Sequence, residues 1–597
     1  FVIDDPTTTR RFQTDFRRLI GELVSENYYG ELGRLARAAG IQFDFETAFG
    51  DITPGDILEY YKHADVPMCE FWCPRGPCWC GSDRFKPFHP TVSAARMYGK
   101  RRVAAEALTG TPLWTERLRE LKHLADRAFA KGVTHMVFNA FPHQPTVTQP
   151  PPGAAFGVTI GTAFTRGQTW WSFMPGFTRY LARIGAMLES TTPETDVLWV
   201  LSDEVDHRPD ELAPGFPAGY NFDFANPDAI LNRLTAQNGR VATPEGIAWR
   251  VLWMPSAERL RAAMAEKLAA FAEAGVPIAI AERPVSSATL ADPDGEAARL
   301  AAAVARLAAC GAFSSDLKGL LVKTVAPDLL GDGLLWSHRA DAENDYWFVT
   351  DDDGVVARAV DASIRTTPDD TGAWQAWNAV SGEKRAFPMT IANGRAAARL
   401  ELPVNGAIIL VRPKQPVPCV RETSASPQTV LTLTSGWSLA IPRIPAPGTV
   451  PTPPLGGDTP SATFALSSFV AWKDLPGADA ETRAFSGTAT YKTSFDWTGS
   501  TAGATLDLGR VEACARVKLN GREIAALWCE PYRCDLSDAL KEGRNDLIVE
   551  VTDSWHNRLV YDAALPEAER KTWVLQYPEK DRAYVESGLF GPVTVQQ

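Results

Sequence analysis

The stretch Val66-Pro-Met-Cys-Glu70-Phe-Trp72 is a short apolar strand with a glutamate near its carboxyl end, and the same pattern recurs on both sides of it. Ile41–Glu46 precedes it and Val103–Glu106 follows it, and both segments end in glutamate. Helical segments separate the strands, and a fourth strand at Thr134–Asn139 completes the series. Because the ends of parallel strands share one face, the sequence predicts three carboxylates at a single mouth, where such folds hold their chemistry.

Residues 1–190 alternate between strand and helix, which indicates βαβ units around a parallel sheet. The helical run Asp15–Ala39 ends at Gly40 and the run Thr115–Lys131 ends at Gly132, as helices with a C-cap glycine do. Only four strands of this kind are visible, whereas a closed barrel needs eight. We therefore expect residues 1–190 to form the C-terminal half of a (β/α)8 catalytic barrel. An open sheet in a smaller α/β domain is the alternative.

The secondary structure predicted for the rest of the chain changes near residue 326, from mixed helix and strand to strand alone. Before it, the buried-type strands Asp196–Leu201 and Val251–Pro255 predict a small doubly wound α/β domain, which carries no Gly-rich phosphate loop. After it, the apolar period changes from 3.6 to 2, which predicts β-sandwiches. We expect a multidomain fold of α/β and all-β parts: an α/β domain at 191–325, a β-sandwich at 326–415, a Pro-rich connection at 416–460 and a second β-sandwich at 461–597.

Charge and hydropathy exclude several classes of partner. The net charge of -12 and the pI near 5.4 argue against nucleic acid or an anionic membrane surface. No apolar run reaches the roughly 18 residues of a membrane span. The chain begins at Phe1 without a signal-like leader, so we expect a processed chain or a fragment. These features leave the oligomeric state open.

Nine cysteines are present, and four of them crowd together between residues 69 and 80, in and directly before the loop after the Glu70 strand. Cys69, Cys73, Cys78 and Cys80 could bind one zinc ion as four thiolates. Their spacing contains no Cys-x-x-Cys pair, so one or two local disulfides of an exported protein are favoured over zinc. Cys529 and Cys534 are candidates for another bridge.

Converging carboxylates suit glycoside hydrolysis, which needs one carboxyl group as acid and another as base or nucleophile. We favour Glu46 and Glu106 as this pair, without assigning which is the acid, and Glu70 as a third carboxylate or a metal ligand. An inverting pair lies about 6.5–9.5 Å apart, so that a water molecule fits between carboxyl and sugar. For each glutamate the structural alternative is a salt bridge at the strand ends. Asp44 alternates with Glu46 onto the same face and is expected deeper in the sheet.

Eighteen tryptophans are more than an average chain carries, and aromatic faces stack on sugar rings. Trp72, Trp170 and Trp171 are the candidates for such stacking, although adjacent tryptophans cannot both face one site and at least one should be core. His143, beyond the fourth strand, is expected to bond a sugar hydroxyl, and His89 is a weaker candidate.

The segment Asp65–Trp72, with its Glu-Phe-Trp, is the first of several motifs that occur in one order along most of the chain. Together these motifs resemble glycoside hydrolase family 106, the α-L-rhamnosidases. The last domain is similar to the galactose-binding-like jelly roll of many glycosidases, through Gly487–Tyr491, Leu508–Val511, Val517–Gly521 and Gly543–Leu547. The other family-like segments are Ser93–Lys100, Ala105–Thr109, Val137–Asn139, His143–Pro145, Thr165–Trp171, His338–Arg339, Tyr346–Phe348, Trp377–Gly382 and Asn557–Leu559.

The resemblance implies a (β/α)8 barrel that removes terminal α-L-rhamnosyl residues from plant or bacterial glycans with inversion. It also implies a calcium ion in the active site, with Glu70 and Asn139 as the contributors expected from this half of the barrel, and secretion to the periplasm or the outside. Asn139 is in addition a candidate substrate ligand. Two departures stand out: the chain begins about halfway through the barrel, and the Cys73–Cys80 segment is not expected of the family.

Two rival interpretations remain open. The first is a glycosidase of other sugar specificity on the same fold. The second is a non-catalytic glycan-binding protein with a degenerate barrel. Serine-nucleophile and zinc-protease chemistry are disfavoured, since neither Gly-x-Ser-x-Gly nor His-Glu-x-x-His occurs.

Overall fold

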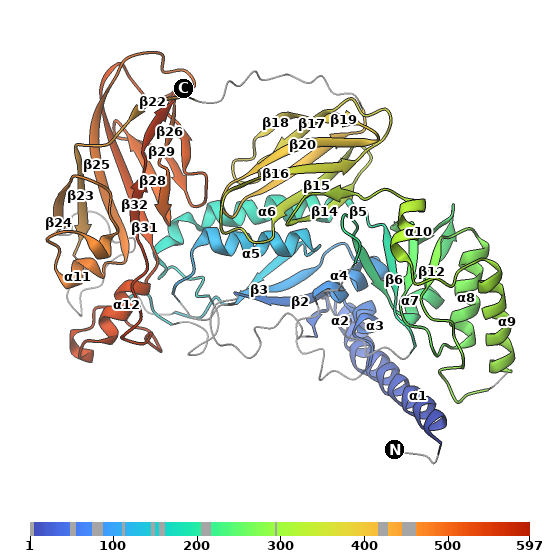
Figure 1. The fold of residues 1–597 in the computed structure, drawn as a ribbon. Coiled ribbons are helices and arrows are strands. Elements are labelled where there is room, and N and C mark those ends of the chain that lie inside the picture. The colour runs from blue at the N-terminus through green and yellow to red at the C-terminus, as the bar shows by residue number, and fades with distance from the viewer. Residues whose placement is uncertain are drawn as a thin grey trace.

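The structure, a computed structural model, describes most of the chain and places it in four packed parts (Figure 1). It contains α/β units and many β-sheets, as the sequence predicts. Among the described residues no helix is both long and apolar enough to cross a membrane. The described ranges are 5–47, 55–73, 88–109, 114–144, 150–154, 162–203, 216–292, 295–415, 428–443 and 461–597.

The four glutamate-series strands form one parallel sheet in the order β1-β2-β3-β4. Ala104 and Ala105 of β3 and Ala95 of α4 are buried. Because their side chains are small, the helix and the sheet approach closely. Helices α4 and α5 follow β2 and β3, and α6 follows the loop after β4. The bounds are β1 Asp44–Glu46, β2 Val66–Trp72, β3 Ala104–Thr109, β4 His135–Phe138, α3 Ile57–Tyr60, α4 Phe88–Met97, α5 Leu118–Ala130, η4 Thr169–Phe173 and α6 Met174–Ser190.

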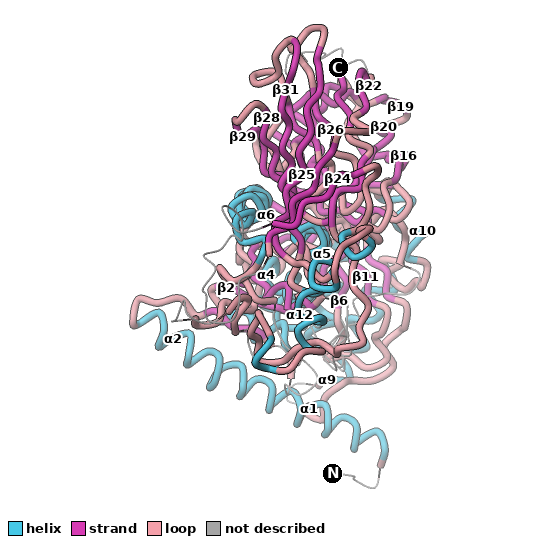
Figure 2. The backbone as a smooth tube through the Cα atoms, turned by 90° about the vertical axis from the view of Figure 1, so that its left-hand side faces the viewer, coloured by secondary structure: helices cyan, strands magenta, loops and turns pink. Residues whose placement is uncertain are grey.

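The first helical run extends away from the body of the molecule (Figures 1 and 2). It consists of α1 (Pro6–Val24), a π-helical segment at Ser25–Gly30 and α2 (Glu31–Ala38), and it ends before Gly40, whose φ of 71° suits a glycine C-cap. The apolar side chains of Phe16, Leu19 and Leu23 are exposed on α1 at helical spacing. The helix therefore presents an apolar face to solvent.

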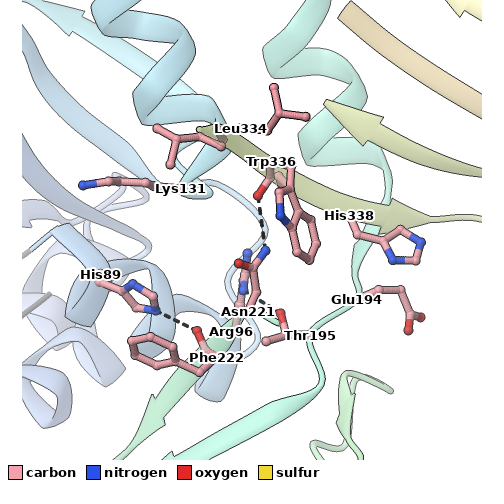
Figure 3. Close-up of a pocket in the computed structure, with 13 residues that line it drawn as sticks. His89, Arg96, Lys131, Glu194, Thr195, Asn221, Phe222, Leu334, Trp336 and His338 are labelled. Carbon is pink, nitrogen blue, oxygen red and sulfur yellow. Dashed lines mark hydrogen bonds between the residues drawn. The ribbon is translucent and has the colours of Figure 1, made fainter. Parts of the chain in front are cut away.

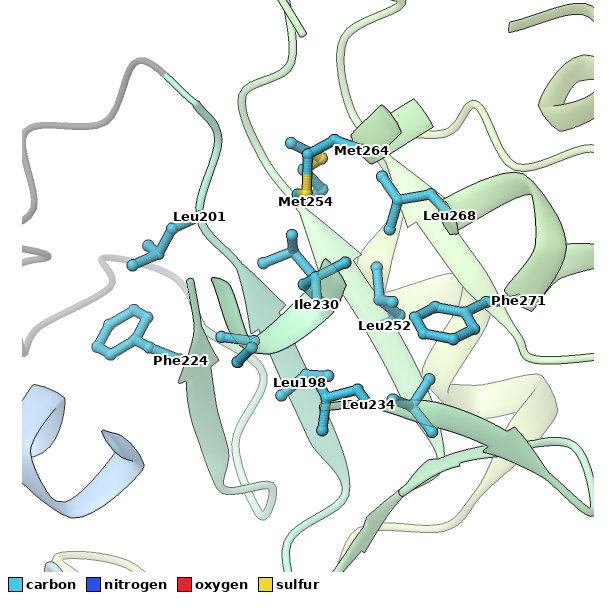
Figure 4. Packing of buried hydrophobic residues seen from close by; sticks show 14 of the residues in the cluster. Leu198, Leu201, Phe224, Ile230, Leu234, Leu252, Met254, Met264, Leu268 and Phe271 are labelled. Carbon is cyan, nitrogen blue, oxygen red and sulfur yellow. The ribbon is translucent and has the colours of Figure 1, made fainter. Parts of the chain in front are cut away.

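The second α/β part holds a parallel sheet in the order β12-β11-β6-β7, with helices packed on it (Figure 4). Leu198, Leu252 and Phe271 lie in its core. The same core continues into the N-terminal part through Leu58 and Tyr60. The bounds are β6 Val197–Val200, β7 Phe222–Ala225, β11 Val251–Met254, β12 Ile278–Ile280, α7 Pro227–Asn232, α8 Ala262–Glu273, α9 Glu296–Ala309 and α10 Leu317–Thr324, and a small sheet is formed by β8 Thr235–Gln237, β9 Arg240–Ala242 and β10 Ala248–Trp249.

Two antiparallel sheets follow, in the orders β13-β16-β20-β19 and β18-β17-β21-β15-β14-β5. Trp347 and Trp374 stack at a centroid distance of 5.0 Å in the core around them. The edge strand β5 (Thr192–Pro193) comes from the start of the region that the sequence assigns to the α/β domain. The other bounds are β13 Leu329–Leu330, β14 Leu334–Ala340, β15 Asn344–Asp351, β16 Arg358–Arg365, β17 Ala373–Trp377, β18 Lys384–Pro388, β19 Thr390–Ala392, β20 Arg395–Leu402 and β21 Ala407–Pro413.

The C-terminal part is a second antiparallel sandwich with sheets β22-β33-β26-β30 and β24-β23-β25-β31-β28-β29. It includes strands from residues 428–443, which the sequence assigns to the Pro-rich connection. The reason is the alternation in Trp437–Pro442, which buries Trp437, Leu439 and Ile441 in the sandwich core. The bounds are β22 Thr429–Thr432, β23 Trp437–Pro442, β24 Ser461–Leu466, β25 Gly487–Trp497, β26 Thr505–Asp507, β27 Arg510–Glu512, β28 Cys514–Leu519, β29 Arg522–Leu527, β30 Arg533–Asp535, β31 Gly543–Asp553, β32 Gly588–Gly591, β33 Thr594–Gln596, α11 Ala480–Arg483 and α12 His556–Ala563.

The predicted Cys529–Cys534 bridge is wrong. Both residues are free thiols, because they belong to different cores: Cys529 packs with the helices of the N-terminal part, and Cys534 faces the interior of the C-terminal sandwich. Burial raises the pKa of each thiol to about 12. In the cysteine-rich loop, Cys78 and Cys80 lie outside the described residues, so the local disulfide or zinc cluster there stays a prediction.

Candidate active site

Three glutamates from neighbouring strands meet at the carboxyl end of the parallel sheet. Glu70 of β2 is in register with Glu106 of β3, and Glu46 of β1 is in register with Met68, two residues before Glu70 and on the same face. One carboxylate oxygen from each glutamate lies within 4.8 Å of the others. The tertiary structure thus brings together the three carboxylates that the sequence singles out.

Glu106 is held by two hydrogen-bond donors. Asn139 Nδ2 donates to Glu106 Oε1 over 2.6 Å, and Thr109 Oγ1 donates to the same oxygen over 3.0 Å. Asn139 follows β4, and Thr109 is the last residue of β3. Both donors are therefore anchored to strand ends, and they set the orientation of the Glu106 carboxylate.

Glu70 is oriented by Trp72 from its own strand. Trp72 Nε1 donates to Glu70 Oε2 over 3.1 Å, and the Glu70 side chain is buried. The two residues are separated by one position, so they extend from the same face of β2. The indole N–H is therefore committed to the carboxylate, and only the ring remains for contact with a sugar.

The distance between the carboxylate oxygens of the three glutamates limits the chemistry that they can perform. Oxygens within 4.8 Å are closer than the roughly 6.5–9.5 Å between the carboxyls of an inverting pair, and nearer the roughly 5–5.5 Å of a retaining pair. Ionised carboxylates at such separation repel one another unless one takes a proton or a cation lies between them. An oxygen-only donor set fits a hard cation such as calcium, which takes 6–8 oxygen ligands. The three glutamates could supply part of that shell.

The two adjacent tryptophans have different surroundings. Trp170 is 1% exposed, and its indole N–H donates to Glu116 O over 3.2 Å. Its ring packs edge-on against Phe164. Trp171 is 37% exposed. Trp170 is thus a core residue, and Trp171 is the member of the pair that is exposed to solvent.

The two histidine candidates lie in different places. His143 is exposed in the loop after β4. His89 donates through Nε2 to Phe222 O over 2.7 Å and stacks on the Phe222 ring. It lines a cavity of about 150 Å³ where α4, β7 and β14 meet, together with Arg96 and Asn221 (Figure 3). His89 therefore faces the second α/β part and not the glutamate cluster. Asp44 is exposed at the start of β1, two residues before Glu46.

A buried carboxyl that the sequence does not single out follows β3. Burial raises the pKa of Glu116 to about 8, and Glu116 Oε2 has no hydrogen-bond partner among the described residues. The side chain is therefore protonated at neutral pH. Nothing in the local sequence around Glu116 distinguishes it from a surface glutamate.

The sequence also does not show that Asn139 and Thr109 hold the Glu106 carboxylate. Thr109 lies in the family-like segment Ala105–Thr109, and the sequence predicts Asn139 as a ligand of metal or sugar. The Thr109 bond is made within β3, where the register shifts beside Leu108, whose φ is 64°. The Asn139 bond to Glu106 depends on the alignment of β3 with β4, in which Glu106 is opposite Val137. A strand alignment of this kind cannot be read from residue spacing.

Comparison with known proteins places these features in context. A family model described as α-L-rhamnosidase, glycoside hydrolase family 106, matches residues 1–390. A curated protein of Formosa agariphila named putative β-glucuronidase is 29% identical over 433 residues, which are 69% of this chain and 35% of that protein. The structure of a rhamnosidase from Novosphingobium sp. PP1Y is similar with a TM-score of 0.85 and 25% identity, over 99% of this chain and 56% of that one. The chain thus spans between about a third and a little over half of the length of these relatives.

Proposed function

The chain belongs to glycoside hydrolase family 106, and from that premise we propose that it carries the carboxylates of an active site that removes terminal α-L-rhamnosyl residues from plant or bacterial glycans. The observation that carries the proposal is the meeting of Glu46, Glu70 and Glu106 at the ends of adjacent parallel strands. Acidic side chains at this position are costly to bring together without a function. A glycosidase uses such carboxyls in pairs.

Glu106 and Glu46 are the proposed catalytic pair. One of them, protonated, gives its proton to the departing glycosidic oxygen, while the other, ionised, takes a proton from the water that attacks the anomeric carbon. Asn139 and Thr109 hold Glu106 in place for this step. Inversion, which the family resemblance implies, requires bound substrate to separate the pair beyond the present spacing or one carboxyl to come from outside the cluster.

Glu70 is the proposed metal ligand. Its carboxylate oxygens suit calcium, and the Asn139 side-chain oxygen is a further donor of the right kind. A calcium ion bound there would supply positive charge that offsets the mutual repulsion of the carboxylates and polarises sugar hydroxyls. Trp72 fixes the Glu70 carboxylate for this role. The ring faces of Trp72 and Trp171 and the imidazole of His143 are the proposed sugar contacts.

Residues 1–190 are proposed to be half of a (β/α)8 barrel. Two observations support this: β1 and β4 are the edges of a parallel sheet, and α1 exposes the apolar residues Phe16, Leu19 and Leu23. Further strand–helix units of a longer chain would pair with those edges and cover that face. The galactose-binding-like assignment of the C-terminal sandwich and a periplasmic or extracellular location rest on resemblance alone.

A different sugar specificity is the second candidate. The Formosa agariphila relative named putative β-glucuronidase favours it, because the same carboxylates would serve either substrate. The third candidate is glycan binding without catalysis.

Release of rhamnose from p-nitrophenyl α-L-rhamnoside tests the proposal. The assay is run in the full-length gene context, with calcium and with chelator, on wild type, Glu46→Gln and Glu106→Gln. The control is Glu266→Gln, because the Glu266 side chain of α8 pairs at the surface with Arg299 of α9. Calcium-dependent release that both cluster variants abolish and the control retains supports the proposal. Proton NMR of the first-formed sugar anomer reports inversion or retention.

Two other outcomes would redirect the proposal. Release from p-nitrophenyl β-D-glucuronide and not from the rhamnoside would establish the second candidate. Folded protein that cleaves no glycoside of a broad panel, yet binds glycans, would establish the third.

A further inference from the structure

The loop that carries Asn139 is held in place by the C-terminal sandwich. After β4 the chain returns at Thr162, and the two segments pair: Ala140 N donates to Thr162 O over 2.9 Å, and Thr162 N donates to Asn139 O over 3.1 Å. Thr162 Oγ1 also donates to Leu108 O of β3 over 2.8 Å. Thr162 is therefore bonded to the strand of Glu106 and to the residue that orients Glu106.

Trp555, from the start of α12, fixes this returning segment from the other side. Its indole N–H donates to Gly167 O over 2.7 Å. Its buried ring packs in one cluster with Ala163 of the returning segment and Trp114 of the loop after β3. In Figure 1, α12 lies at the base of the C-terminal sandwich. A side chain almost 390 residues distant in sequence thus contacts the loops after β3 and β4 together.

The fit between these segments is tight. A Cβ atom at Gly167 would lie 2.0 Å from Pro152 O, so the segment around Pro152 is packed directly against Gly167. On its far side the same segment exchanges backbone bonds with Trp573: Gly153 N donates to Trp573 O over 3.0 Å, and Trp573 N donates to Pro151 O over 3.2 Å. The loop after β4 is therefore bonded to the segment that follows α12 as well as to Trp555.

The helix that presents Trp555 is itself anchored. Arg558 is buried and pairs with Asp562 at 2.7 Å and with Glu481 of α11 at 2.9 Å. Asn557 Nδ2 donates to Val585 O over 3.0 Å, and Leu559 joins the cluster around Trp555. The Asn557-Arg558-Leu559 motif, which the chemistry of the glutamates leaves unexplained, thus builds a rigid support for Trp555.

We infer that Trp555 is a positioning residue of the active site: through Gly167, Thr162 and Asn139 it sets the orientation of the Glu106 carboxylate, so that the C-terminal sandwich is part of the catalytic unit. The inference rests on the proposed function for its catalytic consequence. Its structural core, the hold of Trp555 on the Asn139 loop, can be measured without any activity.

The test compares two substitutions that remove the same kind of bond. Trp555→Phe keeps an aromatic ring and loses the N–H that binds Gly167 O. Trp437→Phe, in the same sandwich, loses an indole bond to Leu433 O of 2.9 Å away from the interface. Amide hydrogen exchange is followed in peptides covering residues 139–144 and 162–168. We expect faster exchange in both peptides in Trp555→Phe and unchanged exchange in Trp437→Phe.

Kinetics then test the catalytic consequence. We expect Trp555→Phe to lower kcat about tenfold with KM changed less than about twofold, because small displacements of a reacting group cost rate more than binding. In the Asn139→Ala background, Trp555→Phe should lower kcat no further, because both substitutions disturb the same chain of contacts to Glu106. Additive losses, or a loss equal to that of Trp437→Phe, would overturn the inference.

The inference about Trp555 and the proposed function can be refuted independently of each other. Unchanged exchange in Trp555→Phe overturns the inference whatever the enzyme does. Faster exchange in a protein whose wild type cleaves no glycoside supports the hold of Trp555 on the loop and refutes the proposed function.

Discussion

Glu70 and Glu106 lie directly opposite each other on β2 and β3, with a carboxylate oxygen of each within 4.8 Å of the other. Parallel neighbours in register share a face of the sheet, so the two carboxylates cannot turn away from each other without leaving the strand ends. Each is held by its own donors, Trp72 for Glu70 and Asn139 with Thr109 for Glu106. This enforced proximity underlies the first two predictions.

Removing the Asn139 amide should impair catalysis more than binding. Asn139→Ala deletes the 2.6 Å bond to Glu106, and we expect kcat to fall about 10- to 100-fold with a small change in KM. Steady-state kinetics on the rhamnoside measure both constants. Asn221→Ala is the control, because it deletes an amide bond to Trp336 O in the cavity of Figure 3. Equal kcat values for wild type and Asn139→Ala would contradict the positioning role.

Removing the Trp72 N–H should weaken calcium binding. Trp72→Phe frees Glu70 Oε2 from its donor, and loss of such an orienting partner typically costs 10- to 100-fold in metal affinity. Calorimetric titration with calcium alone measures the change. Trp377→Phe is a matched control, since Trp377 Nε1 donates to Gln375 Oε1 two residues earlier on β17. If both variants bind calcium as wild type does, Glu70 is not a ligand that Trp72 orients.

Stability should depend on pH through Glu116. In the unfolded chain this carboxyl ionises near its ordinary pKa, 4.5, whereas in the folded protein burial raises the pKa to about 8 and it keeps its proton. Folding stability from this group is therefore present below pH 4.5 and is lost as the pH rises toward 8, by about 1.4 kcal/mol per pH unit as an upper limit.

Glu116→Gln cannot ionise and should escape this loss. Thermal unfolding at pH 5 and pH 8 should show the variant gaining on wild type at the higher pH. The control Glu266→Gln removes a carboxyl whose pKa is lowered, chiefly by its bond to Arg299, and should show no such gain. A constant difference in Tm between Glu116→Gln and wild type across the two pH values would argue against a protonated Glu116.

The contact between the N-terminal part and the C-terminal sandwich should depend on Arg117. Its guanidinium binds both oxygens of Asp553 at 2.8 and 2.7 Å and Glu512 at 2.5 Å, and all three side chains are buried. Arg117→Gln leaves two buried carboxylates without this partner, which typically costs about 3–5 kcal/mol. Urea unfolding followed by tryptophan fluorescence should show a lower midpoint. Arg306→Gln, which breaks an exposed pair with Glu273, should leave the midpoint in place.

Local patterns in the chain predict α/β units followed by antiparallel sheets, as the structure shows, because apolar period and helix-ending glycines depend on neighbouring residues only. The prediction differs from the structure where the local sequence pattern is weak and long-range packing decides the conformation. Residues 428–443 read as a Pro-rich connection, yet the alternation in Trp437–Pro442 supplies a sandwich strand. Cys529 and Cys534 are close in sequence, but the chain between them turns from one core into another.

The sequence by itself determined which carboxylates meet, since glutamates at the ends of consecutive parallel strands must share one edge of the sheet. It could not determine what holds them. The register of β3 with β4 brings Asn139 to Glu106, and Trp555 reaches Gly167 only because the C-terminal part packs against the N-terminal part. Those contacts are long-range, and residue spacing carries no information about which distant surfaces a folded chain brings together.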